Sequence, residues 1–596
     1  MPSTSAPTPR ASGIYGSFRL DGGSPDPGEI AALGLAEASD KAPWAIAGHD
    51  PFAPDAVSRH DERGAATLIV GYIEDADELA LRLGLDPRSS PARIAEAALQ
   101  RFGHDAPAHV MGEWSLLHRE PDGAVTLMVS AGVRDPLFYA ASGQRLAVAP
   151  DLFALSRLDW VDTRFDEAGL LFPVARAALR AARGDTTMLR GVRQLESGAS
   201  VIIDSQGSVM RRRANVLIAQ PPARHSFDEL MEEAEALLRH IMATRLARTQ
   251  RCAHMLSGGL DSSLLAWLAA EERSAGRDPI AVTSAAPPGS GLTDETEYAA
   301  IVARTIGVEC YKAWPGENAN IYRPALSILS GQNGPPLSNR HVLTDALVTK
   351  AMAHGATLLI DGAYGEMSAT VRLTAQGLKD RLRARAGQIY RGVRAFGSSQ
   401  APHGPFHVRL APHRLAAMPD VMTEALAKPA PTFAMPGKGD LFGYIPGIER
   451  GLALPTEFYP GGLRIEMPFR DMRLLRLFAG MPVSTLLQGG ADRPVVRRML
   501  EGHLPDSIRL RRGGMPASPD HNHRLQHQAS TASERIALFR KAGIDDWLDL
   551  DWLDQALAGM AVTGPQSVNH GNEVQLTAMM AEFLLWWGDQ GRVTTP

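Results

Sequence analysis

The sequence predicts a two-part α/β protein, with a strand-rich N-terminal part and a larger C-terminal part built around a parallel sheet. Within residues 12–215, short apolar or alternating segments such as Thr67–Ile73, Trp114–Leu117 and Val125–Val129 have the pattern of β-strands. After residue 226, candidate strands alternate with candidate helices, which is typical of a parallel α/β sheet. A length of 596 residues leaves room for two large units that each bury a core.

Composition and capping residues mark the boundaries of these parts. Residues 1–11 are rich in Pro, Ser and Thr and lack an apolar stretch, which predicts a disordered extension. A polar, Pro-containing stretch predicts a linker at residues 216–226. Ser226, with Glu229 three residues later, is a candidate N-cap for the first helix of the second part. The second part then covers residues 227–596, and its end is predicted to be mainly helical.

The overall composition is that of a globular enzyme rather than a nucleic-acid or membrane protein. The formal net charge is -5, and no apolar run approaches the roughly 20 residues that cross a bilayer. The two cysteines, Cys252 and Cys310, are too few for a disulfide scaffold or a cysteine metal cluster. These features predict a cytoplasmic protein.

The most informative motif is Ser257-Gly258-Gly259-Leu260-Asp261-Ser262-Ser263, which lies between a candidate strand, Ala253–Leu256, and a candidate helix, Ser262–Glu272. Glycines let the backbone approach an anion, and a helix N-terminus offers free N–H groups. Asp261 could hold the Mg²⁺ that accompanies a triphosphate. Because the motif contains no Gly-Lys-Ser/Thr, it is not the kinase-type phosphate loop. It predicts a site for the pyrophosphate of ATP.

This loop resembles the SGGLDS loop of the asparagine synthetase family, whose members make an acyl-adenylate from ATP and a carboxylate and then let an amine attack it. Arg464–Asp471 is similar to that family's R-x-PF-x-D element, and Leu504–Asp506 with Arg509–Gly514 is similar to its late basic loop. The resemblance implies that the adenine of ATP lies against the candidate strand Ile280–Ser284. The ATP-binding residues that it implies are Leu256, Ser257, Gly258, Gly259, Asp261, Ser262, Ser263, Val282, Ser284 and Gly362.

Two departures from the family pattern bear on the chemistry. Ile360–Glu366 stands where the family has L-S-G-E-G-A-D, so that Glu366 replaces the Asp of a second magnesium contact and Ala363 replaces a Glu, which argues against asparagine synthesis. In the late loop, two arginines stand where relatives have a Lys, and a guanidinium binds phosphate but stays charged. The implied catalytic residues are Asp261, Glu366, Tyr364, Arg511 and Arg512, with Asp261 and Glu366 as metal ligands and Tyr364 as the nearest candidate base. A surface turn at 361–366 and a solvated basic loop are the alternatives.

The N-terminal part resembles class II glutamine amidotransferase domains, which implies an αββα sandwich. Ser12–Gly16 is similar to their Cys-Gly-Ile-Phe-Gly start, and Gly132–Tyr139 is similar to a segment ending in P-L-Y-Y. In that family, the cysteine attacks glutamine and its own α-amine acts as the base. Here the aligned residue is Ser12 and eleven residues precede it, so that no free α-amine exists without cleavage after Ala11. We therefore expect residues 12–215 to form a degenerate domain that does not use glutamine.

An enzyme that makes no ammonia needs an amine from elsewhere, and an amine on the substrate itself has a high effective concentration. Lasso peptide macrolactam synthetases and β-lactam synthetases fit this logic. The latter carry a Tyr where this chain has Ala363, and the basic stretch Arg372–Arg394, which can also be a solvated helix, suits an acidic peptide. The resemblance thus favours a lasso cyclase that uses ATP and Mg²⁺ on a precursor peptide, with a leader-removing protease and a leader-binding protein as partners. A β-lactam synthetase, an ammonia-dependent asparagine synthetase and a non-catalytic scaffold remain alternatives.

Two further patterns favour structural roles. His521-Asn522-His523 lies in a polar stretch without a partner cluster, which favours a loop over a metal site. Trp586-Trp587 ends an apolar helical pattern that begins near Leu576, which favours core packing.

Overall fold

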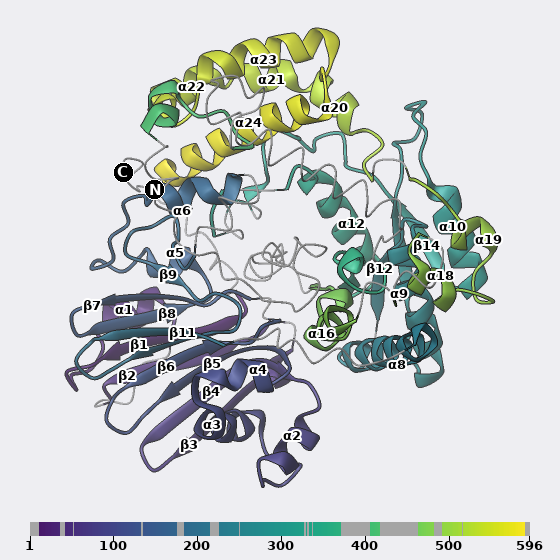
Figure 1. The fold of residues 1–596 in the computed structure, drawn as a ribbon. Helices are drawn as coiled ribbons and strands as arrows, with labels where there is room; N and C mark the ends of the chain where they lie inside the picture. The colour runs from purple at the N-terminus through teal and green to yellow at the C-terminus, as the bar shows by residue number, and fades with distance from the viewer. Residues whose placement is uncertain are drawn as a thin grey trace.

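The protein is described by a computed structural model that covers residues 11–590 except for 36–41, 52, 133–134, 176–183, 215–225, 250, 327–328, 330–332, 336–337, 371–405, 418–462, 482–484, 486–491 and 515–516. The extension at residues 1–10, residues 216–225 of the predicted linker and the basic stretch 372–394 lie outside the described residues. Figure 1 shows an N-terminal pair of sheets at the lower left, a parallel sheet at the right, and the C-terminal helices above them.

Two antiparallel sheets form the N-terminal part, as the sequence predicts. The first has the strand order β2-β1-β8-β7-β9 and the second has the order β11-β10-β6-β5-β4-β3. The first sheet contains β1 (Gly13–Arg19), β2 (Trp44–His49), β7 (Phe138–Ser142), β8 (Arg145–Ala149) and β9 (Arg193–Gln194). The second contains β3 (Val57–Glu62), β4 (Ala65–Ile73), β5 (Gly112–Arg119), β6 (Val125–Val129), β10 (Ala199–Ile203) and β11 (Val209–Arg213). The three segments that predicted strands lie within or close to the bounds of β4, β5 and β6.

The two sheets pack face to face between helices. Apolar side chains from both sheets, such as Leu117 and Val148, form a core between them. Helices α2 (Ala76–Arg82), α3 (Pro91–Phe102) and α4 (Ala106–His109) cover the outer face of the second sheet. The outer face of the first sheet packs against α5 (Leu152–Leu155), α6 (Glu167–Leu171) and the C-terminal helices. The result is the helix–sheet–sheet–helix order that the sequence predicts.

The second part contains a parallel sheet with the strand order β14-β13-β12-β15-β16. Its strands are β12 (Cys252–Met255), β13 (Ile280–Ser284), β14 (Glu309–Ala313), β15 (Leu358–Ile360) and β16 (Arg464–Glu466). Helices α8 (Phe227–Leu246), α9 (Leu260–Glu271), α10 (Thr296–Ile306), α12 (His341–Ala353), α16 (Met472–Gly480) and α18 (Pro494–Met499) accompany it. Ser226 and Glu229 form the predicted capping box at the start of α8. Among the described residues, no helix is both long and apolar enough to cross a membrane.

The C-terminal helices join the two parts through a shared core. They are α20 (His521–His527), α21 (Ala529–Ser533), α22 (Ile536–Lys541), α23 (Leu550–Thr563) and α24 (Val568–Asp589). Trp587 is fully buried against Phe153 and Phe165 of the N-terminal part, so the Trp pair packs in the core as expected. The prediction of a loop at His521–His523 is wrong, because these residues begin α20. Arg524 anchors that helix through Asp520 and through carbonyls of residues 315–319.

We expect the parallel-sheet part to lose stability in acid, because it contains two buried histidines. Burial lowers the pKa of His254, on β12, to about 3 and that of His341, at the start of α12, to about 4. Both side chains stay neutral in the folded protein, whereas in the unfolded chain they take up a proton below about pH 6.5. The stability that they contribute is therefore complete above about pH 6.5 and is lost as the pH falls toward 4 and 3.

Between about pH 7 and pH 5, we expect each histidine to reduce the free energy of unfolding by about 2 kcal/mol. Urea denaturation across this range measures the loss. His254→Leu should flatten the dependence, whereas His523→Gln, at an exposed position on α20, should leave it unchanged. If the free energy of unfolding changed equally with pH in the wild type and in His254→Leu, the expectation would be wrong.

Candidate functional site

A cavity of about 760 Å³ lies at the carboxyl ends of β12, β13, β15 and β16. This edge is where open parallel α/β sheets bind their ligands. The structure brings together most of the residues that the sequence singled out. Those lining the cavity are Leu256, Ser257, Gly259, Asp261, Ser262, Val282, Ser284, Gly362, Tyr364, Glu366 and Arg511. Gly258, Ser263 and Arg512 are not among the lining residues.

The loop between β12 and α9 is closed by its own serine hydroxyls. The Ser257 N–H donates to Ser262 Oγ at 3.2 Å, and the Gly259 N–H donates to Ser257 Oγ at 3.3 Å. Ser262 Oγ in turn donates to the Gly259 carbonyl at 3.2 Å. Ser263 is fully buried, and its Oγ has no hydrogen-bond partner among the described residues. These hydrogen bonds fix the conformation of the loop at the N-terminus of α9, a position that favours an anion.

Gly258 occupies a position that only glycine fits. Its φ is +69°, and a Cβ added there would lie 2.5 Å from Tyr298 Cβ on α10. The loop thus packs directly on the α10 backbone, which explains the glycine in physical terms.

The Asp261 carboxylate, at the start of α9, is held by two distant side chains. Thr370 Oγ1 donates a hydrogen bond to Oδ1, and Arg493 Nη1 lies 2.8 Å from Oδ2. Gly365, in the loop after β15, leaves no room for a Cβ beside the same carboxylate. Arg493 itself has φ +56°, which is uncommon for a residue with a side chain. Asp261 is thus fixed in the cavity and faces a positive charge.

The late basic loop contributes one arginine to the cavity. Arg511 forms an ion pair with Glu295, donates to the Gly258 carbonyl at 3.3 Å, and lies 3.8 Å over the Tyr298 ring. Arg497 of α18 holds this loop by donating to the Arg511 carbonyl at 3.1 Å. Arg512 is exposed, so the structure brings only one of the two predicted arginines to the site.

The loop after β15 forms the opposite wall. Ala363 and Tyr364 line the cavity, Tyr364 has φ +70°, and Arg470 lies 5.5 Å from its ring centroid. Asp361 accepts a hydrogen bond from the Ala363 N–H at 3.0 Å, and loss of hydration raises the pKa of its carboxyl. Glu366 is exposed and lines the same cavity as Asp261. A single loop thus carries the predicted base and the second predicted metal ligand.

Sequence analysis did not identify several residues of this site. Arg340 at the start of α12, Glu295 before α10, and Arg470 after β16 all line the cavity. Arg470 lies inside the stretch that resembles R-x-PF-x-D, which is a signal that could have identified it. Arg493 and Thr370 contact Asp261 from 232 and 109 residues away in the chain, and no local pattern marks them.

The oxygen ligands in the cavity fit Mg²⁺. Asp261 and Glu366 supply hard carboxylate oxygens, and Arg493 shows that the first of them accommodates a positive charge. In the described part of the chain, these two do not form a tight group with a third His, Cys, Asp or Glu. Mg²⁺ commonly takes one or two protein carboxylates and completes its shell with phosphate and water, so a third protein ligand is not needed.

The fold and the cavity define the class of this part, a parallel α/β domain whose site lies at the carboxyl ends of the strands. Residues 233–366 and 461–586 match the family model for asparagine synthase. This match, which covers less than half of the chain, supports an asparagine synthetase-like domain in the parallel-sheet part and suggests an ATP-dependent ligase that forms amide bonds. No curated protein matches the sequence.

The solved structures that match this chain have low sequence identity and low TM-scores. Glutamine phosphoribosylpyrophosphate amidotransferase from B. subtilis, complexed with ADP and GMP, is 14% identical, with 59% of this chain and 76% of that chain covered and a TM-score of 0.23. A structure described as the allosteric regulatory enzyme of purine biosynthesis is 14% identical, with 59% and 74% covered and a TM-score of 0.22. Similarity at this level does not define a shared fold.

Proposed function

We propose that the protein is an ATP-dependent, AMP-forming ligase that adenylates an Asp or Glu side chain of a precursor peptide and joins it to the peptide's N-terminal amine without using glutamine. The observation that carries the proposal is the cavity in which the Ser257–Ser263 loop, Asp261, Glu366 and Arg511 converge at the end of a parallel sheet. This arrangement suits a nucleotide whose phosphates lie at the N-terminus of α9.

In the first step, a carboxylate oxygen of the peptide attacks the α-phosphorus of ATP and pyrophosphate leaves. The loop N–H groups and Arg511 bind the phosphates, while Val282 and Ser284 of β13 border the space for the adenine. Asp261 and Glu366 would hold Mg²⁺, which supplies positive charge for the phosphate oxygens when bound. Catalysis in this step consists of positioning and charge neutralisation.

In the second step, the peptide amine attacks the acyl carbon, the bond to AMP breaks, and an amide forms. The attacking nitrogen must lose a proton, and Tyr364 lines the cavity as the candidate acceptor. Asp361 also lines the cavity and is a second candidate, because burial raises the pKa of its carboxyl group. A comparison of Tyr364→Phe with Asp361→Asn in single-turnover aminolysis separates the two.

Three features support a peptide that supplies its own amine. Ser12 replaces the nucleophilic cysteine of glutamine amidotransferases. Ala363 lines the cavity where asparagine synthetases carry a Glu, so this chain lacks that carboxylate. Intramolecular attack also removes much of the entropic barrier of a bimolecular step. A leader-removing protease and a leader-binding protein would act before this enzyme to free the amine.

Isotope transfer tests the adenylation step. Synthetic peptides with a free α-amine and one internal Asp or Glu, labelled with ¹⁸O in that carboxyl, are incubated with ATP and Mg²⁺. We expect AMP that carries one ¹⁸O atom, because the carboxylate oxygen remains on the phosphate when the amide forms. ADP as the product, or AMP without the label, would contradict an acyl-adenylate.

The proposal predicts that glutamine has no role. The Ser12 side chain is buried, and its Oγ has no hydrogen-bond partner among the described residues. A serine hydroxyl without an activating base is a poor nucleophile at neutral pH. We expect Ser12→Ala to form amide at the wild-type rate, within about twofold, and neither protein to release glutamate from glutamine in a coupled dehydrogenase assay. Glutamate release that Ser12→Ala abolishes would overturn this prediction.

A further inference from the structure

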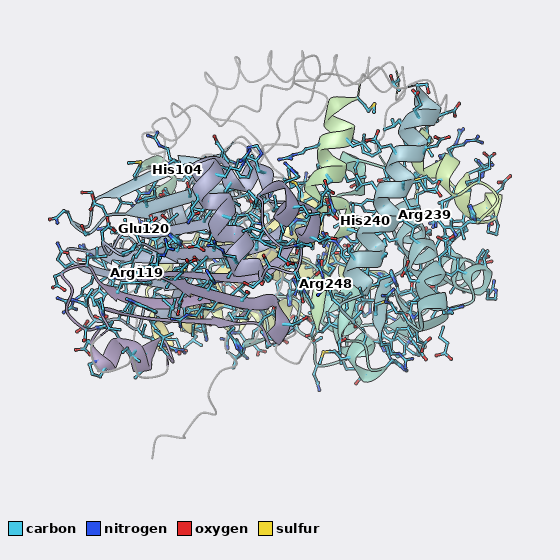
Figure 2. All side chains as sticks on the ribbon, turned by 90° about the horizontal axis from the view of Figure 1, so that it is seen from below. His104, Arg119, Glu120, Arg239, His240 and Arg248 are labelled. Carbon is cyan, nitrogen blue, oxygen red and sulfur yellow. The ribbon has the colours of Figure 1, made fainter. Side chains whose placement is uncertain are left out.

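Four acidic side chains of the N-terminal part meet arginines of the parallel-sheet part. Asp50, Glu74 and Asp75 come from the ends of β2 and β4, and Glu113 comes from β5. Their partners are Arg245 of α8, Arg248 just after α8, Arg464 of β16 and Arg473 of α16. In Figure 2, His240 and Arg248 lie where α8 borders the N-terminal part, whereas Arg239 lies farther from it. His240 also reaches Asp75, at 2.8 Å.

Arg245 is the buried centre of this charge cluster. Its side chain is 2% exposed, and its Nη1 lies 2.8 Å from Glu113 Oε1 and also pairs with Glu466. Its Nη2 lies 3.6 Å from Asp471. Burial alone lowers the pKa of Arg245, but the carboxylates around it raise that pKa well above the usual range. One N-terminal carboxylate therefore shares a buried guanidinium with two carboxylates of the other part.

The cluster fixes both ends of the segment that carries β16. At its start, Arg464 lies 2.8 Å from Glu466 and 3.4 Å from Asp50. At its end, Asp471 caps α16 and pairs with Arg473, which also pairs with Asp75 at 2.8 Å and with Glu74 at 3.8 Å. The segment between these charged residues contains β16, which is the edge strand of its sheet. Within the sheet, β16 therefore has one neighbouring strand, β15.

This segment also forms part of the cavity wall. Ile465, Met467 and Arg470 line the cavity on either side of the buried Glu466. The Glu466 carbonyl accepts a hydrogen bond from the Asp361 N–H at 2.9 Å, and the loop that follows Asp361 carries Tyr364 and Glu366. A shift of Glu466 would therefore move two walls of the site.

We propose that Glu113 and Asp50 of the N-terminal part are positioning residues for the ligase site, acting through Arg245, Arg464 and Glu466 on β16. On this account, the N-terminal part is retained because its acidic edge completes the site, in place of any glutamine chemistry. The catalytic consequence rests on the proposed function, whereas the structural consequence does not. The loop at Ser257–Ser263 lies outside the cluster, so nucleotide binding should depend on it only weakly.

Hydrogen–deuterium exchange tests the structural consequence in the full-length protein without a substrate. Glu113→Gln removes the charge and keeps the size of the side chain. We expect peptides covering residues 358–367 and 463–469 to exchange at least about fivefold faster in this variant, because the hydrogen bonds between β15 and β16 open more often. Peptides from β12 and β13 should not change. Asp77→Asn, on the exposed face of α2, is the matched control and should behave as the wild type.

Kinetics tests the catalytic consequence. For Glu113→Gln we expect kcat for amide formation to fall about tenfold and the KM for ATP to change less than about twofold, with partial rescue in Glu113→Asp. Unchanged exchange at residues 358–367 and 463–469 would overturn the positioning role, as would faster exchange with an unchanged kcat. If the wild type showed no adenylation at all, the proposed function would fail. The hydrogen–deuterium exchange measurement would still decide whether Glu113 positions the two walls of the cavity.

Discussion

We expect Asp261→Asn to lower ATP–pyrophosphate exchange by about a thousandfold, equivalent to about 4 kcal/mol of transition-state stabilisation. The substitution keeps the shape of the side chain and the acceptor for Thr370, but it removes the negative charge that faces Arg493 and would hold Mg²⁺. Exchange of labelled pyrophosphate into ATP measures the loss directly, in the presence of Mg²⁺ and the peptide substrate.

Stability and peptide binding should change much less in this variant. The lost ion pair leaves the buried Arg493 without its acidic partner, which costs about 1–3 kcal/mol of unfolding free energy. Asp278→Asn, at an exposed position in the same part, should retain full exchange activity. If Asp261→Asn kept the wild-type rate of ATP–pyrophosphate exchange, Asp261 would not be a metal ligand on which adenylation depends.

We expect Gly258→Ala to reduce nucleotide-dependent activity strongly, because the substitution displaces the loop. The new methyl group would lie 2.5 Å from Tyr298 Cβ, and the backbone of α10 offers no flexible side-chain end that could move away. The loop would have to move instead, together with the Gly258 carbonyl that receives Arg511. We expect at least a hundredfold loss of ATP–pyrophosphate exchange, or about 3 kcal/mol.

Gly276→Ala is the matched control for backbone conformation. Gly276 also has a positive φ, +78°, but a Cβ there would meet nothing within 4 Å. It should cost about 1–2 kcal/mol of stability and leave activity intact. Equal activities for the two variants would show that the packing of the loop on α10 does not matter for the reaction.

Features with a local cause were predictable from the sequence. The strands β4, β5 and β6 follow from apolar segments, and the capping box at Ser226 marks the start of α8. The loop at residues 257–263 was evident because its glycines, serines and aspartate are consecutive. Its carboxyl-edge position follows from the parallel sheet, since strand ends meet at one edge. The resemblance to the asparagine synthetase family implied that Gly362, Tyr364 and Glu366 share a site with Asp261, and all four line the cavity.

Features that depend on distant contacts were not predictable. Arg511 pairs with Glu295 across 216 residues, and its neighbour Arg512 points to the surface, although the two arginines are equivalent in the sequence. The helix at His521 forms because Arg524 is anchored to residues far away in the chain, and this contact overrides the polar local pattern. The charge cluster around Arg245 joins residues from both parts, so no single stretch reveals it.

The central claim is that the cavity joins a peptide carboxylate to an amine with ATP, and mass spectrometry of the product tests it most directly. Purified protein, ATP and Mg²⁺ are incubated with the synthetic peptides, and in parallel with aspartate and ammonium. The account predicts peptide that has lost one water, with equimolar AMP and pyrophosphate, and no asparagine. Asparagine formation with the peptides unchanged would contradict the account and assign the cavity to an ammonia-dependent synthetase.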